Sequence, residues 1–152
     1  MTSASRLFAE YGAYHRDRRN LICHEIGIPL IVLGIVALLR LVPIWISWLG
    51  TNFAGAMLLA LIFYYIAAFI RPYRWAVIIA TAGLLAIYYV SAFVTWPFAI
   101  GAFVVGWIFQ FVGHAYEGKS PAFLTNLLHL LVGPLWVASH LVPTSASSSS
   151  AR

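Results

Sequence analysis

Residues 53–70 read FAGAMLLALIFYYIAAFI, a run of eighteen residues without one charged side chain. A run of this length predicts a helix that crosses the hydrocarbon core of a bilayer. The helix is required because lipid offers the backbone no hydrogen-bond partners. The run ends at RPYR, residues 71–74, where charge and proline interrupt it. This stretch therefore predicts an integral membrane protein with helical spans.

The rest of the chain has the same character. Of its 152 residues, 62% are hydrophobic and 9% are charged, whereas a soluble domain carries about 25% charged residues. No Asp, Glu, Lys or Arg occurs in residues 41–70 or 75–116. The net charge of +5 suggests arginines that face lipid headgroups, and we expect no binding to nucleic acid. A single cysteine, Cys23, excludes an internal disulfide and a CxxC metal site.

Five apolar segments, each about long enough to cross a bilayer as a helix, can be read along the chain. They cover residues 21–39, 53–70, 75–93, 98–113 and 123–142. Residues 1–18 are expected to form a polar, amphipathic arm without a cleavable signal peptide, and residues 144–152 a disordered low-complexity tail. We therefore predict an all-α polytopic membrane helix bundle of about five transmembrane helices, with residues 1–143 as one domain.

Basic residues divide unevenly between the two ends of such a bundle. With five crossings, one side holds Arg6, Arg16, Arg18, Arg19, Arg71, Arg74 and Lys119, and the other holds Arg40 and Arg152. The positive-inside rule then places the N-terminus in the cytoplasm, and a bacterial inner membrane is the expected location. The same topology brings His15, His24, His114 and His129 toward the cytoplasmic face. Trp136 and most other tryptophans are interpreted as an interfacial belt.

Three polar stripes interrupt the apolar segments, and each pairs an imidazole with a side chain able to orient it. The stripes are Asn20 with His24, Gln110 with His114 and Glu117, and Asn126 with His129. Residues three, four or seven apart share a helix face, and metal-bound histidines commonly have such a partner. Polar groups at membrane depth mark a functional site by default. We expect His15 to belong to a preceding turn or helix that folds back.

Three or four histidines without a cysteine pair suit iron, zinc or copper. Membrane desaturases with diiron sites use many histidines in HxxxH and HxxHH boxes, and this chain has five histidines and no such box. A haem between His24 and His114 would instead make a small electron-transfer protein. A third possibility is a non-catalytic lipid-binding membrane protein with interfacial histidines.

Two stretches resemble the membrane family of 2-hydroxy fatty acid dioxygenases, which includes the fungal enzyme of phytosphingosine breakdown. They are YHRDRRNLICHEIGIP, residues 14–29, and GWIFQFVGHAYEGKSPAFLTNLLHLLVGP, residues 106–134. The residues that match the family pattern are Tyr14, His15, Asn20, His24, Pro29, Trp107, Gln110, Gly113, His114, Glu117, Pro121 and Ala122. Together the motifs span less than a third of the chain.

The resemblance implies an Fe(II)-dependent enzyme that uses O2 to remove C1 of a 2-hydroxy fatty acid, leaving the acid one carbon shorter. The catalytic residues implied are His15, His24, His114 and Glu117, with His15, His24, His114 and a fourth ligand, His129, on the metal. Asn20, Gln110 and Asn126 would support the cofactor site. Arg16, Arg18 or Arg19 would pair with the substrate carboxylate. The oligomeric state and the role of His140 stay open.

Overall fold

The computed structural model describes residues 3–121 and 128–141, and most of the residues in these ranges are helical. In chain order the elements are α1 (Ser3–Ala13), α2 (Arg18–Arg40), β1 (Trp45–Ile46), a 3-10 turn (Ser47–Leu49), β2 (Thr51–Asn52), α3 (Phe53–Ser91), α4 (Trp96–Glu117) and α5 (Leu128–His140). The all-α prediction is confirmed. The small antiparallel β1–β2 hairpin, which joins α2 to α3, was not predicted. The expected tail, 144–152, lies outside the described residues.

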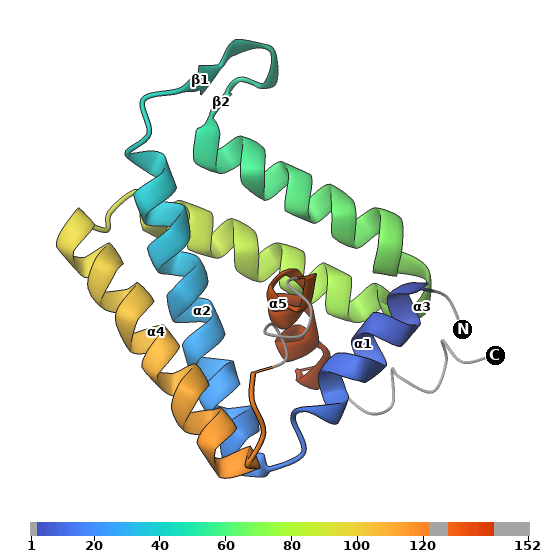
Figure 1. Cartoon of the computed structure of the whole chain (residues 1–152). Coiled ribbons are helices and arrows are strands. Elements are labelled where there is room, and N and C mark those ends of the chain that lie inside the picture. Colours follow the sequence, from blue (N-terminus) through green and yellow to red (C-terminus); the bar gives the residue numbers. More distant parts are fainter. Residues whose placement is uncertain (1–2, 122–127, 142–152) are drawn as a thin grey trace.

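Four helical stretches are long and apolar enough to cross a membrane, namely Arg18–Arg40, Phe53–Arg71, Tyr73–Ser91 and Trp96–Glu117. Two of them belong to α3, which bends at Tyr73, where φ is −135° and ψ is 41°. The two halves of α3 turn back on each other at this bend (Figure 1). Four of the five expected segments therefore appear as membrane-length helices.

The fifth expected segment, 123–142, contains a shorter helix in its described part. α5 has 13 residues, a rise of about 20 Å, which is less than the roughly 30 Å of a bilayer core. α5 lies at the centre of the molecule (Figure 1), and Val132 and Leu135 are fully buried. A helix that is largely buried in protein is apolar, as a membrane span is, so hydropathy alone could not separate the two.

α2 and α4 run antiparallel and approach each other closely along their lengths (Figure 1). A Cβ added to Gly27 would lie 2.8 Å from the carbonyl oxygen of Gly106, and one added to Gly106 would lie 2.7 Å from that of Gly27. Two further close pairs, one on each side of this contact, are Gly34 with Ala99 and Gly113 with Asn20. Small residues let membrane helices pack backbone to backbone, and this contact sets the histidine of α2 opposite that of α4.

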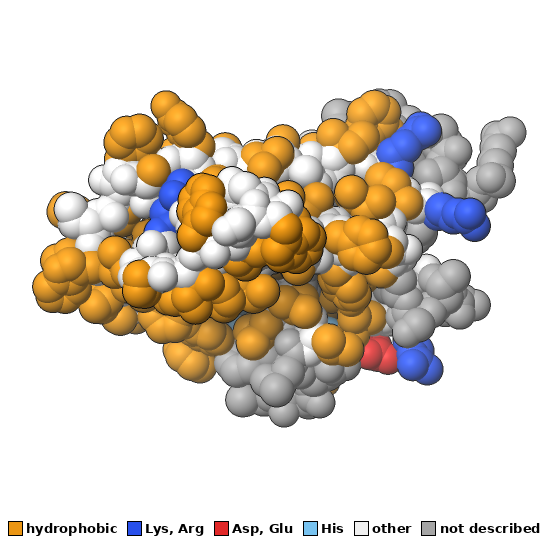
Figure 2. All heavy atoms as spheres, turned by 90° about the horizontal axis from the view of Figure 1, so that it is seen from above, with side chains coloured by type: hydrophobic (Ala, Val, Ile, Leu, Met, Phe, Trp, Pro, Cys, Tyr) orange, Lys and Arg blue, Asp and Glu red, His pale blue; other side chains and the backbone are white. Residues whose placement is uncertain are grey.

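α1 packs across one end of the bundle. The ring of Phe8 stacks on Tyr73 at the bend of α3, with centroids 4.2 Å apart, and Tyr11 contacts Trp136 of α5. The outside of the molecule is apolar: seen from the side of the β1–β2 hairpin, hydrophobic side chains cover most of the visible face (Figure 2). Phe63 and Phe98 are among the exposed large side chains, as expected for helices that face lipid.

Candidate metal centre

Three buried histidines from separate parts of the chain meet near one end of the bundle. His15 lies in the turn between α1 and α2, His24 on the second turn of α2, and His114 near the end of α4. One ring nitrogen from each lies within 4.8 Å of the others, and the three residues are 7%, 1% and 5% exposed. The structure thus brings together the three histidines for which the sequence predicted a common site.

Backbone carbonyls fix the tautomers of two of these histidines. His15 Nδ1 lies 2.7 Å from the carbonyl oxygen of Tyr11, and His24 Nδ1 lies 2.9 Å from that of Asn20. A carbonyl oxygen only accepts hydrogen bonds, so each Nδ1 must carry the hydrogen. In a neutral imidazole the other nitrogen, Nε2, is then left with a bare lone pair, which is the form that binds metal.

The two bare nitrogens face each other. His15 Nε2 and His24 Nε2 lie 2.9 Å apart, and burial lowers the pKa of His15 to about 4, so its ring is neutral at pH 7. Two lone pairs at this distance repel unless a cation lies beside both. Two ligands at right angles, each about 2.1 Å from one ion, are roughly 3 Å apart. The donors therefore fit a metal ion, and His114 Nδ1, a buried nitrogen with no hydrogen-bond partner among the described residues, adds a third.

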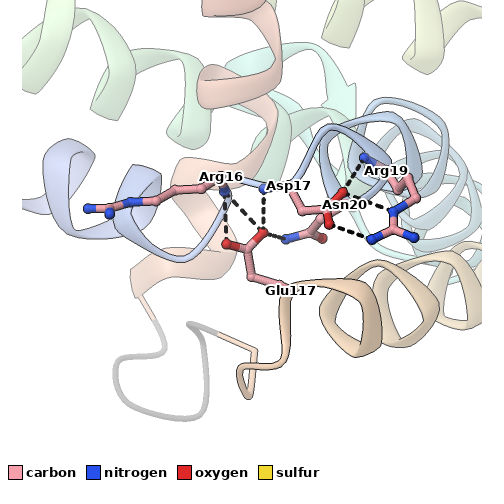
Figure 3. A network of polar contacts seen from close by, with 5 residues as sticks. All are labelled: Arg16, Asp17, Arg19, Asn20 and Glu117. Carbon is pink, nitrogen blue, oxygen red and sulfur yellow. Dashed lines mark hydrogen bonds and ion pairs between the residues drawn. The ribbon is translucent and has the colours of Figure 1, made fainter.

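Glu117 ties the turn that carries His15 to the end of α4 (Figure 3). Its carboxylate accepts hydrogen bonds from the backbone N–H of Arg16 at 3.0 Å and of Asp17 at 2.8 Å. It also accepts one from the side-chain amide of Asn20 at 3.1 Å. Glu117 is thus fully engaged in holding the start of α2, and it acts on the histidines by positioning the turn before them.

The side chain of Asn20 does not orient His24, which differs from the role that the sequence suggested. Its amide nitrogen donates to Glu117 and to the carbonyl oxygen of Tyr14, while its own backbone carbonyl orients His24. Gln110, by contrast, lies at the site with the three histidines. It is buried, and its Nε2 has no hydrogen-bond partner among the described residues.

His129 lies in the wall of the same cavity, outside the group of three histidines. Its Nε2 is 3.9 Å from a carboxylate oxygen of Glu10, and its ring packs edge-on against Tyr11 at 5.8 Å. Its expected companion, Asn126, lies outside the described residues. The role of His129 as a fourth ligand stays a prediction.

The three arginines expected at the substrate carboxylate are exposed, and none of them is among the described residues that line the cavity. Arg19 forms an ion pair with Asp17 at 2.8 Å and lies over the ring of Tyr116 at 4.4 Å. The side chain of Arg16 points away from Glu117 (Figure 3). Their substrate role is a prediction that the geometry leaves untested.

Two aromatic residues at the site were missed from the sequence. Tyr11 stacks on His15 with ring centroids 4.3 Å apart, and Trp136 contacts His15 at 4.8 Å, so Trp136 is a buried neighbour of the site rather than an interfacial residue. Tyr11 precedes His15 by four residues, a spacing that could have signalled the contact. His140 packs edge-on against Trp136, with ring centroids 4.1 Å apart, and Trp136 in turn contacts His15.

A bundle of membrane-length helices that buries three histidines with bare, converging nitrogens defines a helical membrane protein with a candidate metal centre. Comparison with known families gives the particular group. The model of the 2-hydroxy-palmitic acid dioxygenase Mpo1-like family matches residues 1–144, and the chain belongs to this family.

A curated relative from Saccharomyces cerevisiae agrees with the family. It is named 2-hydroxy-palmitic acid dioxygenase MPO1 and is 28% identical over 123 residues, which cover 80% of this chain and 69% of the yeast protein. No solved structure matches the chain. The resemblance read from residues 14–29 and 106–134 is thereby confirmed at the level of the family.

Proposed function

We propose that this protein is an Fe(II)-dependent dioxygenase that shortens 2-hydroxy fatty acids by one carbon. The observation that carries the proposal is the pair of bare nitrogens of His15 and His24 beside His114, in a chain of the Mpo1-like family. The name of the yeast relative supplies the substrate class. The reaction balances when one 2-hydroxy acid and one O2 give the shortened acid, CO2 and water.

The protein's part in this reaction is to hold neutral imidazoles in one place. Bound Fe(II) would supply the redox chemistry toward O2 and the open positions that chelate the hydroxyl and carboxylate oxygens of the substrate. Tyr11 and Asn20 hold the rings of His15 and His24 through their carbonyls. Because the substrate itself supplies the electrons, no 2-oxoglutarate or nicotinamide is needed. We retain His129 as the proposed fourth ligand, since it faces the same cavity.

The cavity beside the histidines suits an amphiphilic substrate. Its polar end holds the three histidines and Gln110, and most of the remaining wall is apolar. Ile28, Val32 and Ile35 line it about one turn apart along α2, so the methylene groups next to the head of the substrate would lie against this helix, away from water. The free amide of Gln110 is placed to donate a hydrogen bond to a substrate oxygen.

We also propose that the site opens on the cytoplasmic side of a bacterial inner membrane. Four spans put the start of α2, the bend of α3 and the end of α4 at one side, together with most of the basic residues, and basic residues favour the cytoplasm. Free acids would reach the site from that leaflet. Arg16 and Arg18 are the better candidates for the substrate carboxylate, because Arg19 is held by Asp17.

The haem alternative is disfavoured by the packing of the rings. His24 and His114 lie 4.9 Å apart between centroids, and His15 contacts both, at 4.2 and 5.1 Å. No space for a planar macrocycle is left between them. A non-catalytic lipid-binding protein would not require three buried nitrogens to converge, so the metal-dependent enzyme is the better account.

The proposal is tested with protein purified without oxygen and loaded with Fe(II). We expect about one non-haem iron per chain, no Soret band, and conversion of 2-hydroxypalmitate to pentadecanoate with O2 uptake. His24→Ala and His114→Ala should each lose iron and turnover. His140→Ala is the matched control, because it removes an exposed imidazole outside the cluster, and it should retain both. The iron content of His129→Ala shows whether His129 is the fourth ligand.

Two results would contradict the proposal. Full turnover in His24→Ala or His114→Ala would show that these residues do not hold the metal. Stoichiometric iron in the wild-type protein without any shortened acid from 2-hydroxy acids of several chain lengths would leave a metal-binding protein of another function.

A further inference from the structure

A second apolar cavity lies behind the wall of the first. The first cavity contains the three histidines and has a volume of about 150 Å³. The second lies between α2, the second half of α3 and α5, and has a volume of about 140 Å³. Ile28, Val32 and Pro134 line both cavities. These three residues therefore form a partition between the two spaces.

The first cavity is too small to enclose a long-chain substrate. An apolar cavity of about 150 Å³ holds a ligand of the size of benzene. The space beside the histidines can therefore take the hydroxyl, the carboxylate and only the first few methylene groups. The remainder of a long acyl chain must continue elsewhere, and the second cavity adds a comparable volume directly behind the partition.

The partition lies where α2 and α5 each lack a backbone hydrogen bond. α2 contains Pro29 and α5 contains Pro134, both inside the helix, and each removes a backbone hydrogen bond and favours a kink. Ile28 packs toward Gly133, which offers no side chain of its own at this crossing of α2 and α5. A few side chains, rather than continuous backbone packing, thus separate the cavities.

We propose that the two cavities form one acyl path, in which the tail of the substrate passes Ile28 and Val32 and ends in the second cavity. The residues of α3 that line this cavity, Gly83 and Leu84 among them, then limit the length of chain accepted. This inference rests on the proposed function, since the histidines must hold the head of the same molecule. The competing route leads out past Ile35 and Leu130, which are half-exposed at the first cavity, into lipid; a tail there would meet no limit on length.

Gly83→Leu tests the path at the second cavity, which Gly83 lines from an exposed position on α3. A Cβ at Gly83 meets no atom within 4 Å, so the substitution should not disturb folding. It should lower kcat/KM for 2-hydroxypalmitate by about tenfold, because roughly two methylene groups would no longer be buried. The kcat/KM for 2-hydroxyoctanoate should be unchanged. Gly101→Leu is the matched control, because its Cβ is equally unobstructed and it lines an apolar groove between α2 and α4 on the outside. An unchanged preference for chain length in Gly83→Leu overturns the inference.

A second measurement uses the wild-type protein and does not depend on turnover. A 2-hydroxypalmitate analogue with a diazirine at the end of its chain is bound, irradiated, and located by peptide mass spectrometry. Adducts within residues 79–87 or 137–141, which line the second cavity, support the path, and adducts confined to segments that do not line this cavity overturn it. If adducts form at 79–87 or 137–141 but no 2-hydroxy acid is shortened, the proposed function fails and the binding path stands. If acids are shortened and the adducts lie elsewhere, only the path fails.

Discussion

Glu117 connects the histidine cluster to the polar end of the bundle through three different donors. Two are backbone N–H groups, of Arg16 and Asp17, and the third is the amide of Asn20. Hydrogen bonds to a carboxylate are stronger than those between neutral groups. The turn that carries His15 therefore depends on a side chain about a hundred positions later in the sequence, on another helix.

Glu117→Gln should weaken metal binding without unfolding the helices. The amide keeps the shape of the side chain but loses the charge and replaces one acceptor oxygen with a donor, which would face the same N–H groups. Changes to groups that position metal ligands typically cost 10–100-fold in affinity, and we expect a loss in this range by Fe(II) titration, with an unchanged helical circular dichroism spectrum.

The matched control for this variant is Glu25→Gln. It removes the same charge one residue from His24 and leaves the contacts of Glu117 in place. Its Fe(II) affinity should equal that of the wild-type protein. Equal affinity in Glu117→Gln as well would show that the turn holds His15 without the carboxylate.

The residue types in the sequence predicted the histidine cluster better than they predicted the groups that orient these histidines. His15, His24 and His114 could be selected because ionisable side chains are rare in the apolar segments. The orienting group of His24, however, is the carbonyl of Asn20, and every residue has a carbonyl. Only the packing of α2 against α4, which draws the side chain of Asn20 to Glu117, decides which part of Asn20 faces the histidine.

Among the elements, the antiparallel pair of α2 and α4 determines where the histidines meet. Gly27 and Gly34 on α2, and Gly106 and Gly113 on α4, are each seven residues apart, which is two helical turns. The spacing is visible in the sequence. It could not be used as a prediction, because glycines are frequent in membrane helices and the partner face is defined only once both helices are placed.

Gly106→Ala should therefore destabilise the bundle. Its Cβ would lie 2.7 Å from the carbonyl oxygen of Gly27 and 2.9 Å from the backbone nitrogen of Ile31, and backbone cannot move aside as a flexible side chain can. Overpacking of this kind costs about 1–3 kcal/mol. The expected result is a lower midpoint of thermal unfolding in detergent, together with weaker Fe(II) binding, since His24 and His114 would be moved apart.

Gly101→Ala on the same helix is the control for helix propensity. Its Cβ meets no atom within 4 Å, and alanine favours a helix over glycine by up to about 1 kcal/mol. Its unfolding midpoint should be equal to or above that of the wild-type protein. A midpoint for Gly106→Ala as high as that of Gly101→Ala would mean that α2 and α4 do not pack through this glycine pair.

For the whole molecule, hydropathy predicted the membrane bundle, and four of its spans are found among the described residues; it did not predict how deeply the last helix packs into the protein. α5 packs against α1, α2 and α3, and it contributes His129 and Trp136 to the surroundings of the site. Its sequence is apolar because it is buried in protein, and the same composition would serve against lipid. What separates the two cases is the packing of the surrounding helices, which the sequence does not display.

With the four membrane-length helices of the described residues as spans, the two ends of the bundle must lie on opposite sides of the membrane, and cysteine labelling can assign them. In a Cys23→Ser background, Trp48→Cys places a thiol at a residue that is 85% exposed in the turn between β1 and β2. Lys119→Cys places one just after α4, at the end that carries the histidines.

Since basic residues gather at the histidine end and favour the cytoplasm, a membrane-impermeant maleimide added to bacterial spheroplasts should label only Trp48→Cys. Lys119→Cys should react only after the membrane is opened, and a permeant maleimide should label both. Labelling of both variants in intact spheroplasts would exclude the four-span arrangement, and the reverse pattern would place the candidate metal centre on the outer side.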